Sequence, residues 1–290
     1  GVSDKQNIKF GIRDVQDYYT ENGYRGFKIN GKKLVIKGAG WVDDLFLNDS
    51  DEKVISQVEY AKHMNLNTIR LEGFWGKNQT LYNAADENGI LLMIGWSCQW
   101  EWESYCGRKE SEFMSIDTPR DIELQSTAYI DQVKWLRNHP SIFLWVLGSD
   151  KLPNPELETK MNNLLKIFDP TRPILSSCKG MSSEGEENIS TITGRSGVKM
   201  AGPYEYVTPN YWYLADKLGG AYSFNTETGP GAQVPPIESI KKMIPEQNLW
   251  PIDSVWNYHC GKNVFGTLDK YISALSNRYG KANSVEEFAA

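Results

Sequence analysis

The sequence predicts an α/β fold, a (β/α)8 TIM barrel that is truncated before its eighth strand. Short β-branched or apolar runs alternate along the chain with amphipathic helical stretches, which is typical of βα units around a parallel sheet. The length of 290 residues suits one such barrel, which usually takes about 250 residues. Seven strand-plus-helix units can be counted, and no sequence remains for an eighth strand. A seven-stranded or open barrel is the alternative explanation.

The first half of the chain holds the most regular units. FKINGKKLVIKG contains an Asn30-Gly31 turn, which predicts a hairpin, and Leu34 to Lys37 is expected to be the first parallel strand. Asp49, Ser50 or Asp51 is expected to cap a helix through VISQVEYAKHMN. The next four strands are predicted at NTIRLEG, LLMIGW, SIFLWVLGSD and RPILSSC. The helices between them are predicted at LYNAADENG, at about Pro119 to Asn138, and at PELETKMNNLLKIFD.

The second half is less regular. GPYEYVTPNYW is predicted to contain the sixth strand and GAYSFNTETGPG the seventh. Helices are expected near 237–243, at LDKYISALSNRYG and within KANSVEEFAA. Residues 1–25 are interpreted as a lead-in from a preceding β-sandwich domain, and 26–290 as the barrel. The start of the chain has neither an initiator Met nor a signal-peptide profile, so we expect a piece of a longer protein, secreted or periplasmic in its full-length form.

Composition excludes several classes of protein. With 31 Lys and Arg against 37 Asp and Glu, the net charge of −6 argues against a nucleic-acid or anionic-membrane partner. No apolar run has the length of a membrane span. The four cysteines and three histidines show no metal-ligand spacing, so neither a metal nor a cofactor is expected; Cys98 and Cys106 could pair or stay free thiols. Aromatic residues make up 12% of the sequence, and they are interpreted either as core residues or as platforms on which sugars stack.

The predicted strand ends carry the candidate functional residues. In a (β/α)8 barrel the active site lies at the carboxyl ends of the strands. Almost every predicted strand end here bears a carboxylate, an aromatic residue, or both. In chain order these residues are Trp41, Asp43, Glu72, Trp100, Glu101, Ser149, Asp150, Tyr204, Tyr206, Trp212, Asn225 and Glu227.

Two of these carboxylates suit glycoside hydrolysis. A retaining glycosidase needs one carboxyl group to protonate the leaving oxygen and a second to attack the anomeric carbon. Asp150 and Glu227, after the fourth and seventh strands, are the pair that position favours, and solvated loop acids are the alternative. Glu72 has the alternative of an internal ion pair with Arg70, two residues earlier on the same face.

Taken in order, FKINGKKLVIKG, NTIRL and NHPSIFLWVLG resemble the barrel domain of glycoside hydrolase family 2. In most of that family the fourth strand ends in Asn-Glu, whereas Ser149 and Asp150 stand here. This departure, with RLEG, GPYEYVTPNYW and FNTETGPG, resembles the exo-β-D-glucosaminidase subgroup. The resemblance implies a retaining, exo-acting hydrolase that releases β-linked D-glucosamine from the non-reducing end of chitosan-type oligosaccharides.

The resemblance also implies roles for individual residues. Asp150 corresponds to the general acid/base, Glu227 to the nucleophile, and Glu72 to a carboxylate near the substrate amine. A short Ser149 beside an acid suits an ammonium group, because charge-assisted contacts are roughly twice as strong as neutral ones. The expected substrate-binding residues are Glu72, Ser149, Trp41, Asp43, Trp100, Glu101, Tyr204, Tyr206, Trp212 and Asn225.

Other interpretations of the same residues stay open. A family-2 β-mannosidase or β-galactosidase is the nearest enzyme alternative. A non-catalytic carbohydrate-binding barrel would keep the aromatic residues but lack the chemistry. The expected partners are a carbohydrate substrate and other domains of the same parent chain, and the fragment alone is inactive if it needs them.

Overall fold

The protein is described from a computed structural model. The chain divides into two compact units, Gly1–Met200 and Ala201–Ala290. The structure describes residues 1–290 except positions 6, 8, 9, 45, 74, 96–106, 110, 114, 181–186, 215–222, 230, 232 and 262–264.

The first unit begins with a small antiparallel sheet. Its strands are β1 (Val15–Tyr19), β2 (Arg25–Ile29) and β3 (Lys32–Leu34), in that order across the sheet. The predicted turn between β2 and β3 is confirmed. Asn30 and Gly31 have φ values of 50° and 74°, the left-handed conformation that a tight hairpin turn of this kind requires at both positions.

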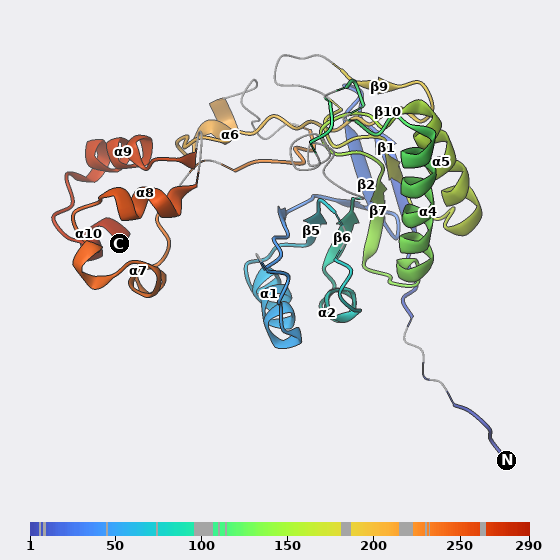
Figure 1. Ribbon diagram of the computed structural model, residues 1–290, viewed down its shortest axis with the longest axis horizontal. Coiled ribbons are helices and arrows are strands. Elements are labelled where there is room, and N and C mark those ends of the chain that lie inside the picture. The colour runs from blue at the N-terminus through green and yellow to red at the C-terminus, as the bar shows by residue number, and fades with distance from the viewer. Residues whose placement is uncertain are drawn as a thin grey trace. The chain divides into compact units, whose positions relative to one another are not determined.

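The main sheet of this unit has five parallel strands, which follow one another across the sheet in chain order (Figure 1). The fold is that of an incomplete (β/α) barrel, and the described residues do not close it. The strands are β4 (Gly38–Gly40), β5 (Thr68–Leu71), β6 (Leu91–Ile94), β7 (Ile142–Val146) and β8 (Ile174–Leu175). All five residues of β7 are buried, as a strand covered on both faces requires.

Helices connect these strands where the sequence predicts them. In Figure 1, α4 and α5 run side by side, and α1 packs against α2 through many residue contacts. The core lies between the sheet and these helices, with Trp145 and Tyr129 both at 0% exposure. Among the described residues these helices are α1 (Asp51–His63), α2 (Thr80–Asn88), α4 (Pro119–Leu136) and α5 (Pro155–Phe168).

The helix starts follow from side-chain capping. Of the three candidates for α1, Ser50 is the N-cap, and its hydroxyl accepts a hydrogen bond from the Lys53 backbone at 3.2 Å. Thr118 and Asn154 cap α4 and α5 in the same way. Each of these two helices has proline at its first turn, where the missing N–H has no cost.

The predicted position of the first parallel strand is wrong. Leu34 closes the antiparallel hairpin, and parallel pairing begins only at Gly38. The reason is the Asn67 side chain, which donates to Val35 O at 2.8 Å and accepts from Lys37 N at 2.9 Å. A side chain at position 38 would meet Thr68 O at 2.6 Å, so glycine permits the close approach of β4 to β5.

The second unit is helical in its described part. The helices expected near 237–243 and at the C-terminus are confirmed, and they enclose a separate core that includes Ile240, Trp256 and Phe288. The helices are α6 (Tyr211–Leu214), α7 (Ile237–Met243), η1 (Glu246–Asn248), α8 (Ser254–Cys260), α9 (Asp269–Tyr279) and α10 (Val285–Ala289).

The predicted sixth and seventh strands are wrong as far as the structure describes them. Among the described residues, 202–212 contain no strand, and 223–229 contain only a single β-bridge residue, Asn225. Instead, the Asn225 side chain satisfies nearby backbone groups: it accepts from Ala201 N at 3.2 Å and donates to Gly202 O at 2.7 Å. Side-chain bonds of this kind compete with a strand ladder for the same backbone groups. One further hairpin, β9 (Ile189–Ser190) with β10 (Gly194–Arg195), belongs to the first unit.

Over the described residues, no helix joins the length to the apolar character that crossing a bilayer requires.

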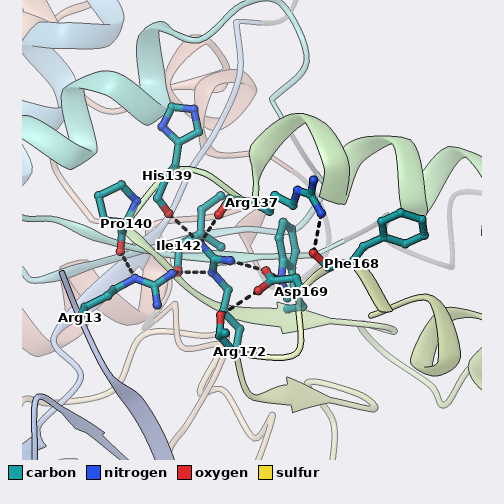
Figure 2. A network of polar contacts seen from close by, with 10 residues as sticks. Arg13, Arg137, His139, Pro140, Ile142, Phe168, Asp169 and Arg172 are labelled. Carbon is teal, nitrogen blue, oxygen red and sulfur yellow. Dashed lines mark hydrogen bonds and ion pairs between the residues drawn. The ribbon is translucent and has the colours of Figure 1, made fainter. Parts of the chain in front are cut away.

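A buried polar network ties the N-terminal segment to the start of β7 (Figure 2). Arg172, whose side chain is 3% exposed, forms an ion pair with Asp169 and donates to the carbonyls of Arg137, His139 and Ile142. Arg13 donates to Ile142 O at 2.9 Å from the other side. Burial, and then the charge of Arg172, lower the pKa of Arg13 to about 10. The Asp169 carboxylate, with a smaller contribution from Asp86, thus compensates this cationic cluster.

We expect Asp169→Asn to lower the free energy of unfolding by about 3 kcal/mol, because it leaves the buried Arg172 without its carboxylate. Urea denaturation followed by circular dichroism measures the change. The control is Asp131→Asn on α4, whose carboxylate is 69% exposed and should matter by less than about 0.5 kcal/mol. Equal effects of the two substitutions would contradict the role of Asp169.

Candidate active site

A small pocket lies where the parallel strands of the first unit end. Parallel strands present their carboxyl ends at one edge of a sheet, so residues far apart in sequence meet there. The pocket is lined by Arg70, Glu72, Gly95, Val146, Gly148, Ser149 and Cys178, which come from β5, β6, β7 and β8 or directly follow them.

Three polar side chains form the floor of this pocket. Arg70 donates to Ser149 Oγ at 2.9 Å, and the same hydroxyl lies 3.4 Å from Glu72 Oε1. The guanidinium of Arg70 lies 3.6 Å from the same Glu72 oxygen. Glycine at position 95 also lets the ends of β5 and β6 lie close together, because a Cβ there would lie 2.3 Å from Glu72 O. The predicted substrate residues Glu72 and Ser149 are thus brought together.

The ion pair considered for Glu72 is present. It is long, however, and the Glu72 side chain is 44% exposed while that of Arg70 is 12% exposed. An exposed pair of this geometry contributes little to stability. The carboxylate therefore keeps access to solvent, and a cationic ligand could contact it without breaking the core.

Ser149 is held by its backbone as well as by Arg70. Its residue exposure is 3%, and its carbonyl accepts from Ser177 Oγ at 2.8 Å and from Lys179 N at 3.2 Å. Asp150 follows directly and is half-buried. The end of β7 thus presents a fixed hydroxyl and, next to it, a carboxyl group.

Trp41 stands at the same edge. Its backbone N–H donates to Arg70 O at 2.8 Å, and its indole Nε1 donates to Asp43 Oδ1 at 2.9 Å. Asp43 therefore orients the ring, which also packs against the core. Trp100 and Glu101 lie outside the described residues.

The second unit contains the other predicted site residues. Tyr204 donates its hydroxyl to Glu227 Oε2 at 2.7 Å, so these two are brought together. The Tyr206 ring packs edge-on against Tyr271 of α9, with 5.3 Å between centroids. Trp212 is 46% exposed. Asn225 bonds the backbone, as described above, which gives it a structural role in this unit.

Some features of the site are not visible in the sequence pattern. The sequence indicates Arg70 only as a partner of Glu72, whereas in the structure Arg70 also donates to Ser149. Cys178, whose thiol is buried, lines the pocket, and its place just after the predicted fifth strand is the signal that the sequence offers. The sequence pattern also does not reveal that Tyr204, a predicted substrate-binding residue, donates to Glu227. In the described part of the chain no three His, Cys, Asp or Glu side chains gather as metal ligands would.

A parallel β/α sheet with a pocket and acidic side chains at its carboxyl edge defines the class of (β/α) barrel proteins. Residues 23–208 match the family described as glycosyl hydrolases family 2, TIM barrel domain. The chain therefore belongs to glycoside hydrolase family 2.

Relatives with known names resemble the chain over nearly its whole length. An exo-β-D-glucosaminidase of Streptomyces avermitilis is 35% identical over 99% of this chain and 31% of its own length. A mannosylglycoprotein endo-β-mannosidase of Lilium longiflorum is 27% identical over 99% of this chain and 33% of its own.

Among solved structures, the exo-chitosanase CsxA of Amycolatopsis orientalis aligns with a TM-score of 0.81 and 32% identity, over 97% of this chain and 33% of that one. Two variants of that protein, with alanine in place of an aspartate or a glutamate, are solved in complex with PNP-β-D-glucosamine. The chain thus spans about a third of the length of the relatives it matches.

We expect Glu72→Gln to lower the free energy of unfolding by less than about 1 kcal/mol, because its ion pair is long and half exposed. The matched comparison is Asp121→Asn on α4, whose carboxylate is 12% exposed and lies 2.7 Å from Arg108. That substitution should cost about 1.5–3 kcal/mol. Urea denaturation of both variants decides whether Glu72 is structural; a loss at Glu72 as large as that at Asp121 would contradict a ligand-facing role.

Proposed function

We propose that the protein to which this chain belongs is a retaining, exo-acting glycosidase that releases β-linked D-glucosamine from the non-reducing end of chitosan-type oligosaccharides. The observation that carries the proposal is the Ser149-Asp150 end of β7, with Glu72 beside Ser149 in one pocket. The names of the relatives support the same sugar.

The proposed chemistry uses two carboxyl groups. Asp150 protonates the glycosidic oxygen while Glu227 attacks the anomeric carbon and forms a glycosyl-enzyme. Asp150 then acts as a base and activates the water that releases the sugar. A retaining reaction requires these two carboxyl groups to come within roughly 5–5.5 Å of each other around the substrate.

The surroundings of each carboxylate suit its role. The hydrogen bond from Tyr204 fixes the orientation of the Glu227 carboxylate, which a nucleophile needs in order to attack along one direction. Asp150 lies beside Ser149, whose position is fixed by Arg70 and by two bonds to its carbonyl. The proposed acid/base therefore follows an anchored residue shortly after the end of β7.

The preference for an amino sugar follows from the pocket. A 2-amino group is an ammonium near neutral pH and donates hydrogen bonds; it cannot accept one from an amide. Ser149 and Glu72 offer acceptor oxygens, and the carboxylate adds charge. Trp41, Tyr206 and Trp212 are proposed to stack on sugar faces. Asp43 in the first unit, and Tyr204 and Asn225 in the second, are proposed as further substrate-binding residues. Trp100, Glu101 and a secreted or periplasmic location stay predictions.

We expect Glu227→Gln to reduce turnover of an aryl β-D-glucosaminide by several orders of magnitude, because the amide cannot form the glycosyl-enzyme. The assay uses the protein in its natural full length. The control is Glu246→Gln in η1, an exposed residue of the same unit. Comparable turnover by Glu227→Gln and the control would contradict the assignment.

The same assay separates the alternatives by substrate. With aryl β-mannosides and β-galactosides beside the glucosaminide, a family-2 mannosidase or galactosidase would prefer its own sugar. The mannosidase alternative has a specific relative in its favour. Binding of chitooligosaccharide without release of glucosamine would instead support a non-catalytic barrel.

A further inference from the structure

Three consecutive residues of the second unit are each held by a distant partner. Tyr204 donates to Glu227, Glu205 forms an ion pair with Lys270, and Tyr206 packs edge-on against Tyr271. Lys270 and Tyr271 are neighbours on α9, more than sixty positions along the chain. One helix thus contacts two of the three residues of the segment that carries Tyr204.

The helix α9 is itself anchored. The Tyr271 ring packs edge-on against Phe288 of α10, with centroids 5.9 Å apart and planes at 86°. Phe288 is 3% exposed and also contacts Trp256 of α8. An edge-to-face series of rings therefore connects Tyr206 to the helical core of this unit.

The opposite side of the segment meets the stretch that follows Glu227. Gly229 N donates to Pro203 O at 2.9 Å. At Gly231, which has a φ of 86°, a Cβ would lie 2.0 Å from Tyr206 N, so only glycine allows the two backbones to come this close. Residues 204–206 therefore contact α9 through Glu205 and Tyr206 and the backbone of Gly231 through Tyr206. Tyr204 donates its hydrogen bond to Glu227 from this segment.

We propose that Tyr271 and Lys270 of α9 are positioning residues for the Glu227 carboxylate: they fix residues 204–206 and so hold the Tyr204 hydroxyl on Glu227. The inference rests on the proposed function and deepens it. Tyr271 carries most of the effect, because the Glu205–Lys270 pair is 50% and 61% exposed and is screened by solvent. The edge-to-face contact between the Tyr206 and Tyr271 rings joins the segment to α9.

The test is a set of variants in the protein of natural length, assayed with an aryl β-D-glucosaminide. Tyr271→Leu keeps apolar bulk against Phe288 but loses the ring edge that meets Tyr206. It should lower kcat about tenfold and change KM by less than kcat, because the alignment of the attacking carboxylate is lost while the Tyr206 ring itself remains. Tyr271→Phe keeps the ring and should retain kcat. Ser273→Ala, at an exposed position of α9, is the control.

A double-mutant cycle distinguishes positioning from general structural support. Tyr204→Phe removes the hydrogen bond directly, so adding Tyr271→Leu to it should cause little further loss of kcat. The inference would be overturned if the kcat losses of Tyr204→Phe and Tyr271→Leu multiplied in the double variant, or if Tyr271→Leu left kcat unchanged.

For the ion pair, Glu205→Lys with Lys270→Glu should recover the kcat that either single substitution loses. If Glu227→Gln stays active, the proposed function itself fails; if only the Tyr271 results fail, the role of α9 alone is rejected.

Discussion

The parallel register of β5 to β8 is the constraint on which the site in the first unit depends. Because these strands run in one direction, their carboxyl ends share one edge, and Arg70 at the end of β5 reaches Ser149, 79 positions later, at 2.9 Å. The buried Arg172–Asp169 network stabilises the start of β7, while Ser177 and Lys179 fix its far end. A strand anchored at both ends gives the pocket its rigidity.

The sequence predicted β5 to β8 and their helices because hydrophobic periodicity and capping residues are local signals. It misplaced the first strand because the Asn67 side chain, thirty residues away, occupies the backbone groups of residues 35–37. It also predicted strands within GPYEYVTPNYW and GAYSFNTETGPG, where the described residues form no extended strand and the Asn225 side chain bonds the backbone. Glu72 and Ser149 were predictable from their place at strand ends, whereas the partners of Arg70 and Tyr204 depend on tertiary geometry.

The two units share one feature. In each, a residue proposed to touch substrate receives a hydrogen bond from a neighbour that restricts its orientation: Ser149 from Arg70, and Glu227 from Tyr204. Fixed orientation of this kind lowers the entropic cost of reaching the transition state. Under the proposed function, the acidic side chains at the strand ends would attract a cationic sugar, in accord with a net charge of −6.

The central claim is that Ser149 and Glu72 select a free amine. It is tested most directly by comparing hydrolysis of aryl β-D-glucosaminide with that of its N-acetylated counterpart in the protein of natural length. The acetyl group removes the positive charge and the ammonium donors that the Glu72 carboxylate would bind. We predict that kcat/KM for the free amine exceeds that for the acetamide by about a hundredfold or more. This factor corresponds to the loss of one charge-assisted contact together with the poorer steric fit of the acetyl group. Equal kcat/KM values for the two substrates would contradict the account.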